Sequence, residues 1–64
     1  MFERPGLIVR SSRYQKGISQ RNLAKLTGLP NGYISHIENG KRGVGEEVAK
    51  KLAKALDIDY KLLM

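Results

Sequence analysis

Glycine residues at regular intervals are the feature that most restricts how this chain can fold. Gly17, Gly28, Gly40 and Gly45 divide it into short segments of helical length, and glycine often ends a helix because it accepts the left-handed backbone conformation. No segment shows a sustained two-residue alternation of Val, Ile and Thr, which is the pattern that predicts strands. The sequence therefore predicts an all-α fold.

Capping residues and apolar periodicity indicate five helices between these breaks. Ser19 is a good N-cap for the second helix, because its hydroxyl can accept a hydrogen bond from a free backbone N–H. Glu46 and Glu47 suit the start of the fourth helix, where the helix dipole favours negative charge. The expected helices run from Pro5 or Gly6 to Gln15, and over about 20–27, 31–39, 46–56 and 60–64.

The connection between the second and third helices is only Gly28-Leu29-Pro30. Two helices joined so tightly must cross at a steep angle, and Ala24 fits this crossing because a larger side chain would push them apart. Ile34 and Ile37 form the inward stripe of the third helix, since residues three apart share a face.

The composition excludes several other classes of protein. A chain of 64 residues makes one domain at most, predicted over residues 1–64, and a domain of this size buries only about 60% of its unfolded surface. It has no cysteine and one histidine, which excludes disulfides and the usual structural zinc sets. No carboxylate pair, nucleophile–base set or phosphate loop is present, so we expect no enzyme activity, cofactor or metal.

The location of the chain is predicted from what its sequence lacks. The absence of cysteine fits a reducing cytoplasm, and no apolar run approaches the roughly 18 residues that a membrane span needs. The N-terminus, Met1-Phe2-Glu3-Arg4-Pro5, lacks the basic-then-apolar order of a signal peptide. We therefore expect a cytoplasmic protein with no membrane partner.

The net charge of +6 is unevenly distributed along the chain. Residues 1–42 hold eight basic and two acidic side chains, whereas residues 43–64 hold four of each. This asymmetry favours a polyanion partner for the first two thirds and a structural or self-association role for the rest. A simple contribution to solubility is the alternative that charge alone leaves open.

The stretch SQRNLAKLTGLPNGYISHIENGKR, residues 19–42, resembles the Xre family of helix-turn-helix regulators, which includes the phage repressors and Cro-type proteins. The likeness lies in the joint order and spacing of Ser19-Gln20, Leu23-Ala24, Gly28, Tyr33-Ile34-Ser35 and Ile37-Glu38-Asn39-Gly40-Lys41. Residues 52–56 look like the family's fourth helix, and the resemblance covers roughly residues 6–64. It implies a compact five-helix, phage repressor-like domain that binds double-stranded DNA.

The resemblance also implies which residues contact DNA. In this family the second helix of the motif reads bases in the major groove while the first holds the backbone. The residues expected to read bases are Asn31, Gly32, Ser35 and His36. The expected phosphate contacts are Ser19, Gln20, Tyr33, Asn39, Lys41 and Arg42. Gly32 departs from the polar residue often found at its position, and Pro30 stands where the family prefers a Ser or Thr cap.

Each of these positions also has a purely structural interpretation. In this interpretation Tyr33 is a packing residue, and Asn31 and Asn39 are ordinary residues at helix ends. The side chains that would simply be solvated are those of Gln20, His36, Lys41 and Arg42. Arg13 and Glu38 stand where the family pairs an arginine of the first helix with a glutamate of the third. The alternative for these two is a pair of independent surface charges.

The sequence therefore predicts a sequence-specific DNA-binding transcriptional regulator, most simply a repressor that blocks polymerase. We expect a homodimer on a two-fold-related operator, because one short helix reads few base pairs. The apolar C-terminal residues expected to form the dimer contact are Tyr60, Leu62, Leu63 and Met64. The alternative is an antitoxin or a protein-interaction adaptor, in which the same residues would bind another protein.

Overall fold

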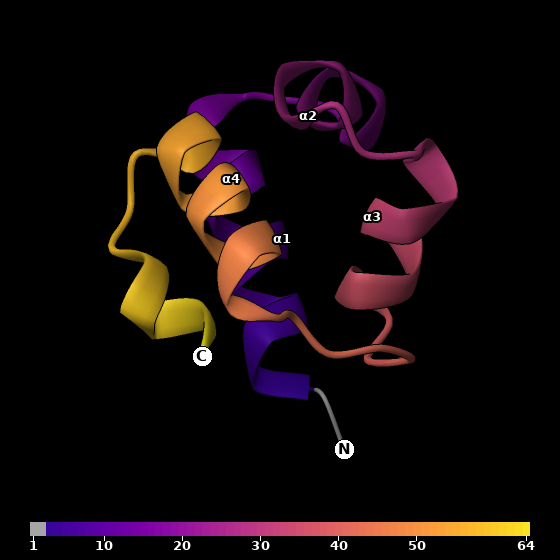
Figure 1. The fold of residues 1–64 in the computed structure, drawn as a ribbon. Helices are drawn as coiled ribbons and strands as arrows, with labels where there is room; N and C mark the ends of the chain where they lie inside the picture. Colours follow the sequence, from indigo (N-terminus) through magenta and orange to yellow (C-terminus); the bar gives the residue numbers. More distant parts are fainter. Residues whose placement is uncertain (1–2) are drawn as a thin grey trace.

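Local sequence signals set the helix boundaries in the computed structural model, which describes residues 3–64. Over this range the chain forms four α-helices and one short 3-10 helix (Figure 1), with no strand. They are α1 (Glu3–Lys16), α2 (Gln20–Thr27), α3 (Asn31–Glu38), α4 (Glu46–Leu56) and η1 (Tyr60–Leu63). The all-α prediction is confirmed.

Capping hydrogen bonds and residues in the left-handed backbone conformation mark the starts and ends of these helices at the predicted positions. The Ser19 hydroxyl accepts a hydrogen bond from the Asn22 N–H at 3.0 Å and begins α2. Gly28 ends α2 with a φ of 76°, and Asp57 ends α4 with a φ of 58°. Asp57 tolerates this left-handed conformation better than most residues with a side chain. Pro30 precedes α3 and gives it no side-chain cap, because the proline ring has no group that accepts a hydrogen bond.

Two predicted helices differ from those observed. The first begins at Glu3 rather than at Pro5 or Gly6, because proline is tolerated throughout the first turn, where its missing N–H has no intrahelical partner. The predicted fifth helix, over residues 60–64, is a 3-10 helix of four residues, Tyr60–Leu63. Its carbonyls accept hydrogen bonds from three residues ahead, as Asp59 does from the Leu62 N–H at 3.0 Å, which is the pattern that short helical pieces commonly adopt.

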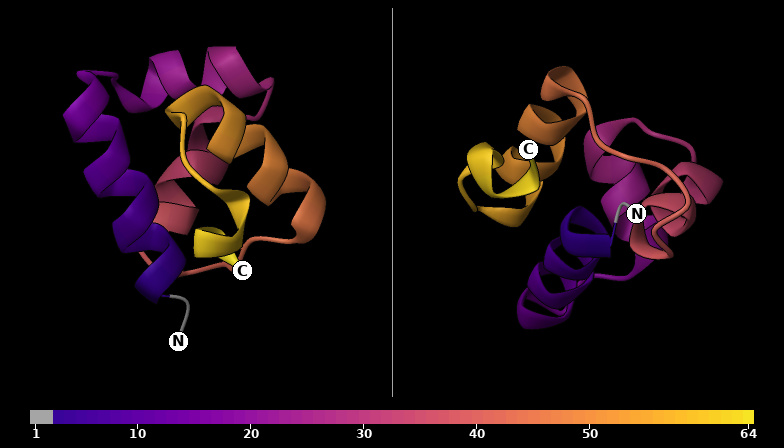
Figure 2. Two further views of the ribbon diagram at one scale, coloured as in Figure 1. Left: turned by 90° about the vertical axis from the view of Figure 1, so that its left-hand side faces the viewer. Right: turned by 90° about the horizontal axis from the view of Figure 1, so that it is seen from below.

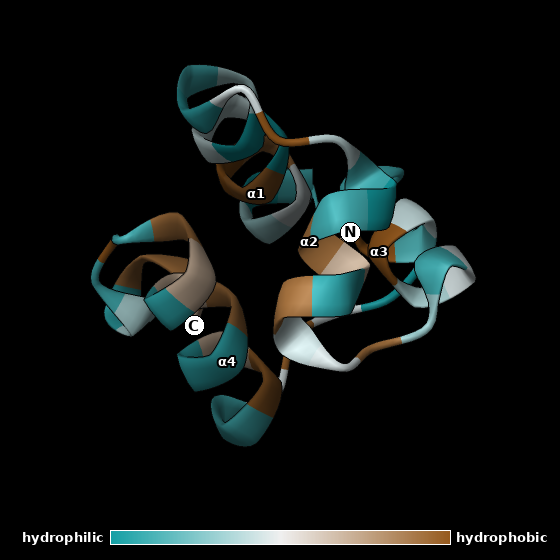
Figure 3. Cartoon of the chain, turned by 90° about the horizontal axis from the view of Figure 1, so that it is seen from above, coloured by the Kyte–Doolittle hydropathy of each residue, from teal (hydrophilic) through white to brown (hydrophobic). Residues whose placement is uncertain are grey.

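The core lies where the inner faces of the four α-helices and η1 meet. Figure 3 shows the apolar side of α2 and α4 turned toward the middle of the molecule and the polar side turned outward. The buried apolar residues are Val9, Leu23, Ala24, Ile34, Ile37, Ala49, Leu52, Ala53, Leu56 and Leu63. Every α-helix therefore contributes to one shared core, which fixes how α2 and α3 lie relative to α1.

Gly6 allows α1 to approach the end of α3 closely. A Cβ atom at this position would overlap the backbone carbonyl oxygen of Ile37 and lie 3.0 Å from that of Glu38. Gly6 is therefore a packing residue within α1, whereas the sequence suggested only a place near the helix start. The close approach sets the position of the C-terminal end of α3.

The arrangement leaves α3 at the edge of the molecule, away from α4 and η1 (Figures 1 and 2). The loop of residues 39–45 returns the chain from α3 to α4. None of the helices within residues 3–64 combines the length and the hydropathy that a membrane-spanning segment requires.

Candidate nucleic-acid interface

The turn between α2 and α3 is held by the side chain of Thr27. Its hydroxyl donates to the Leu23 carbonyl at 2.8 Å and accepts from the Leu29 N–H at 3.3 Å. With Gly28 in the left-handed conformation, these bonds close the three-residue connection. The orientation of α3 relative to α2 is thus fixed by local contacts and by the core below.

The outward face of α3 carries the residues predicted to read bases. Ile34 and Ile37 are fully buried, so the opposite side of the helix faces solvent. Asn31, Gly32 and His36 are exposed there, and Ser35 is half-buried. The structure thus brings all four of the predicted base-reading positions onto one continuous surface; their contact with bases stays a prediction.

Beneath this face, α3 is joined to α1 by an ion pair between Arg13 and Glu38. The Arg13 Nε donates to Glu38 Oε2 at 2.7 Å and a second guanidinium nitrogen donates to Oε1 at 3.0 Å. Only 9% of the Arg13 side chain and 3% of the Glu38 side chain are exposed. The hydrogen bond to Glu38 raises the pKa of Arg13 above its ordinary value, so the guanidinium stays charged.

Gln20 belongs to the same network, which the sequence did not predict. Its Nε2 donates to Glu38 Oε1 at 3.2 Å, and Arg13 also donates to the Ile18 carbonyl at 3.0 Å. The carboxylate of Glu38 thus holds α1, the start of α2 and α3 together. Gln20 is half-buried at the first position of α2, and its amide nitrogen has a second N–H that can donate.

Burial of Glu38 determines the charge of the motif's surface. Glu38 is the only acidic residue in residues 19–42, and Arg13 neutralises it inside the protein. The other charged residues of this stretch are exposed and basic: Arg21, Lys25, Lys41 and Arg42. The helix-turn-helix therefore presents positive charge without an exposed carboxylate of its own.

Contacts among the predicted phosphate-binding residues hold part of this surface in place. The Arg42 guanidinium carbon lies 4.0 Å from the centre of the Tyr33 ring, a cation–π contact. Tyr33 is half-buried and packs against the core, which fits the packing interpretation; a contact of its hydroxyl with phosphate stays a prediction. Asn39 Nδ2 donates to the Ser35 hydroxyl at 3.4 Å, while Ser19 and Lys41 are exposed on either side of the motif.

One of the predicted dimer residues is corrected by the structure. Leu63 is 1% exposed and packs in the core of its own chain, because η1 folds back against α1 and α4. Tyr60 is half-buried and packs against the same core. Leu62 and Met64 keep 46% and 64% of their surface exposed, so these two remain free to contact a second molecule.

A cluster at the end of α1 was also missed from the sequence. The guanidinium carbons of Arg10 and Arg13 lie 5.8 and 4.7 Å from the centre of the exposed Tyr14 ring. Arg10, and then Arg13, lowers the pKa of the Tyr14 phenol. The spacing of Arg10 and Tyr14, four apart on one helix face, was the available signal.

Within residues 3–64 no three His, Cys, Asp or Glu side chains gather to hold a metal.

Comparison with known proteins places this geometry in a family. The family described as Helix-turn-helix matches residues 9–63. The HTH-type transcriptional repressor RghR of Bacillus subtilis is 44% identical over 57 residues, which are 88% of this chain and 42% of that protein. An uncharacterized HTH-type transcriptional regulator of Mycobacterium tuberculosis is 36% identical over 58 residues, 91% of this chain and 41% of the other. The chain thus spans about two fifths of the length of these curated relatives.

Solved structures share the arrangement of all the helices. The restriction-modification controller protein C.AhdI from Aeromonas hydrophila is 40% identical with a TM-score of 0.89, over 98% of this chain and 96% of that one. The biofilm regulator SinR, solved in complex with DNA, is 27% identical with a TM-score of 0.87, over 94% and 98% of the two chains. The family match covers most of the sequence and agrees with the resemblance to Xre regulators, so this chain belongs to the helix-turn-helix family.

Proposed function

We propose that this chain binds double-stranded DNA in a sequence-specific way and regulates transcription, most simply as a repressor that blocks polymerase. The observation that carries the proposal is the surface of the motif, where an exposed polar face of α3 lies among basic side chains and the single carboxylate is buried. An α-helix fits the major groove, where base edges differ in their donors and acceptors. SinR, which has the same fold, is solved in complex with DNA.

In this proposal the outward face of α3 reads the bases. The Asn31 amide suits a bidentate contact with adenine, and Ser35 and His36 lie one turn further along the helix. Gly32 has open space where a side chain would stand, so the start of α3 can come close to the base pairs. The buried stripe of Ile34 and Ile37 holds this face outward.

The phosphate contacts in this proposal come from groups around α3. Gln20 lies at the N-terminus of α2, where backbone N–H groups and the helix dipole favour an anion, and its amide is already positioned by Glu38. Tyr33 offers its hydroxyl beside the Arg42 guanidinium. The remaining expected contacts are Ser19, Asn39 and Lys41.

The dependence of DNA affinity on salt tests the proposal. The logarithm of the binding constant should fall by about 0.9 per unit of log salt for each phosphate contact. Replacing Lys41 and Arg42 together by glutamine should reduce the slope by about 2 if both contact phosphates. Replacing Lys51 and Lys54 of α4 makes the same change in charge away from α3 and should leave the slope nearly intact. A flat salt dependence of the unaltered protein would contradict DNA binding.

A homodimer that pairs through η1 is part of the same proposal. Leu62 and Met64 are exposed apolar side chains in or next to η1. The ribbon of η1 lies on the side of the molecule away from α3 (Figure 2), so pairing there leaves the DNA face free. Deleting residues 60–64 would also remove the core residue Leu63, and substitution is the cleaner test. Leu62→Asp with Met64→Asp should yield monomers in sedimentation and weaken operator binding more than non-specific binding. A monomeric unaltered protein at high concentration, with and without operator, would contradict the dimer.

The antitoxin or adaptor alternative predicts a different result. Affinity for random duplex DNA would then be negligible, while Leu62 and Met64 would be needed for binding another protein. The exposed apolar pair fits either a second copy or another protein, and the basic surface around α3 favours the DNA-binding function.

A further inference from the structure

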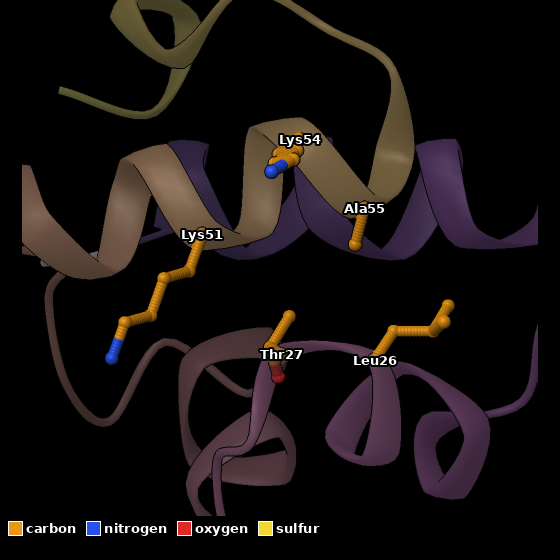
Figure 4. A pocket seen from close by; sticks show the side chains of 5 residues that line it. All are labelled: Leu26, Thr27, Lys51, Lys54 and Ala55. Atoms are coloured by element: carbon orange, nitrogen blue, oxygen red, sulfur yellow. The ribbon is translucent and has the colours of Figure 1, made fainter.

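An exposed leucine of α2, Leu26, lines two neighbouring hollows of the surface. Leu26 keeps 63% of its surface exposed, although it is a large apolar residue. One hollow, about 450 Å³ in volume, lies between α2 and α4 and is lined by Leu26, Thr27, Lys51, Lys54 and Ala55 (Figure 4). The other hollow, about 280 Å³, is lined by Leu26, Ile18, Asn22 and Lys25. We refer to this surface as the Leu26 groove.

Every charged residue that lines the Leu26 groove is a lysine. The apolar residues that line it are Ile18, Leu26 and Ala55, and its lysines are Lys25, Lys51 and Lys54. Among residues 3–64, the carboxylates that pair with lysine do so elsewhere, Glu46 with Lys50 and Asp57 with Lys16. The three groove lysines thus keep charges that the folded chain leaves without an ion-pair partner in the described residues.

We propose that the Leu26 groove binds an acidic peptide segment of another protein, with one large apolar side chain of that segment seated against Leu26 and Ala55. Its carboxylates would pair with Lys51 and Lys54, so that charge complementarity orients the peptide along α4. An apolar side chain of the peptide would cover Leu26 and Ala55, which a phosphate backbone would not use. A second copy of this chain offers no segment with excess carboxylates, because residues 1–42 carry excess positive charge and residues 43–64 are neutral.

The position of the groove allows the peptide and DNA to bind together. Its lining residues come from α2, α4 and the loop before α2, and none comes from α3. Lys51 and Lys54 project from α4 beside the groove (Figure 4). The inference goes beyond the proposed DNA binding and does not depend on it, since the groove can be tested without DNA.

A labelled peptide is a direct probe of this surface. The probe is a short fluorescein-labelled peptide with a Leu-Leu pair flanked by Asp and Glu residues, and its control has a Ser-Ser pair instead. We expect saturable binding of the probe by fluorescence anisotropy and weaker binding of the control by about tenfold, the effect of leaving a partly buried leucine in water. In NMR spectra of the ¹⁵N-labelled protein, the amides of Thr27 and Ala55 should shift on binding.

Substitutions in exposed positions separate the groove from general charge attraction. Leu26→Ser should weaken binding of the probe by about tenfold. Leu7→Ser changes an exposed leucine of α1 instead and should leave the affinity for the probe unchanged. Lys51→Glu with Lys54→Glu should weaken binding of the probe at least as much. The charge-matched control is Arg4→Glu with Lys61→Glu, at two exposed positions outside the groove. Circular dichroism would check that each variant is folded.

Several outcomes would overturn the proposal. Equal binding of the Leu-Leu and Ser-Ser peptides would show that charge alone attracts them. Competition between the probe and duplex DNA, with shifts confined to α3, would place the peptide on the DNA face. Shifts of Thr27 and Ala55 caused by DNA would assign the groove to DNA. If the protein binds DNA but does not bind the probe, the groove proposal is wrong and the proposed DNA binding is unaffected.

Discussion

The two faces of α3 belong to the same eight residues but are held in opposite ways. On the inward face, Ile34 and Ile37 are fully buried, and the Glu38 carboxylate accepts hydrogen bonds from Arg13 and Gln20. On the outward face, Asn31 and His36 are exposed. A substitution on the inward face should therefore move or unfold the whole helix. A substitution on the outward face should alter only the contacts that the helix makes with a binding partner.

The largest effect should follow removal of Arg13 from the ion pair. Arg13→Ala leaves the 3%-exposed Glu38 carboxylate without its main partner, and loss of one member of a buried pair costs about 3 kcal/mol or more. Urea unfolding would measure this loss of free energy. A double-mutant cycle with Glu38→Gln should show strong coupling, and additive effects would mean that the inner face is not held by this pair.

A slightly smaller effect should follow filling the contact between α1 and α3. Gly6→Ala places a methyl group against the backbone carbonyls of Ile37 and Glu38, and backbone cannot yield as the end of a flexible side chain can. Overpacking of this kind costs roughly 1–3 kcal/mol in unfolding free energy, despite the better helix propensity of alanine. Thermal unfolding by circular dichroism would measure it. An unchanged or raised melting temperature would show that α1 and α3 can separate at little cost.

On the outward face, Asn31→Ala should change DNA choice and not stability. We expect a loss of about 1–3 kcal/mol on the preferred site and relaxed selection at one or two base pairs. Its unfolding free energy should stay within about 0.5 kcal/mol of the unaltered protein. Selection of bound sites from random duplex DNA measures the first effect.

Gln20→Ala is the comparison variant for that selection. It removes a side chain expected at the phosphates together with the hydrogen bond to Glu38, so it should weaken all sequences to a similar degree. A changed preference with Gln20→Ala and an unchanged one with Asn31→Ala would mean that α3 does not lie in the major groove.

The smallest effect should be a gain in stability at Gly32. No atom lies within 4 Å of the place where its Cβ would stand, and alanine is favoured over glycine in a helix by up to about 1 kcal/mol. Gly32→Ala should raise the unfolding free energy by about 0.5 kcal/mol, in contrast to the same substitution at Gly6. A lower unfolding free energy for the Gly32→Ala protein would show that the outward face of α3 has no room for an added methyl group.

Features that depend on a few neighbouring residues could be predicted from the order of the amino acids. Ser19 begins α2 and Asp57 ends α4 because a cap hydrogen bond and a left-handed φ involve only adjacent backbone. The inward stripe of α3 followed from the spacing of Ile34 and Ile37, since periodicity decides which residues share a face. The motif's spacing was also enough to indicate the family, which the comparison with known proteins confirmed.

Features that depend on where separate helices meet could not be predicted in this way and became visible in the folded chain. Gly6 has the same local propensity wherever it stands, and its importance comes from the α3 carbonyls beside it. Gln20 bonds to Glu38 across 18 positions of sequence, and Leu63 enters the core because η1 folds back on α1 and α4. Such contacts are set by the crossing of whole helices, because the shared core fixes distances that no local sequence pattern contains.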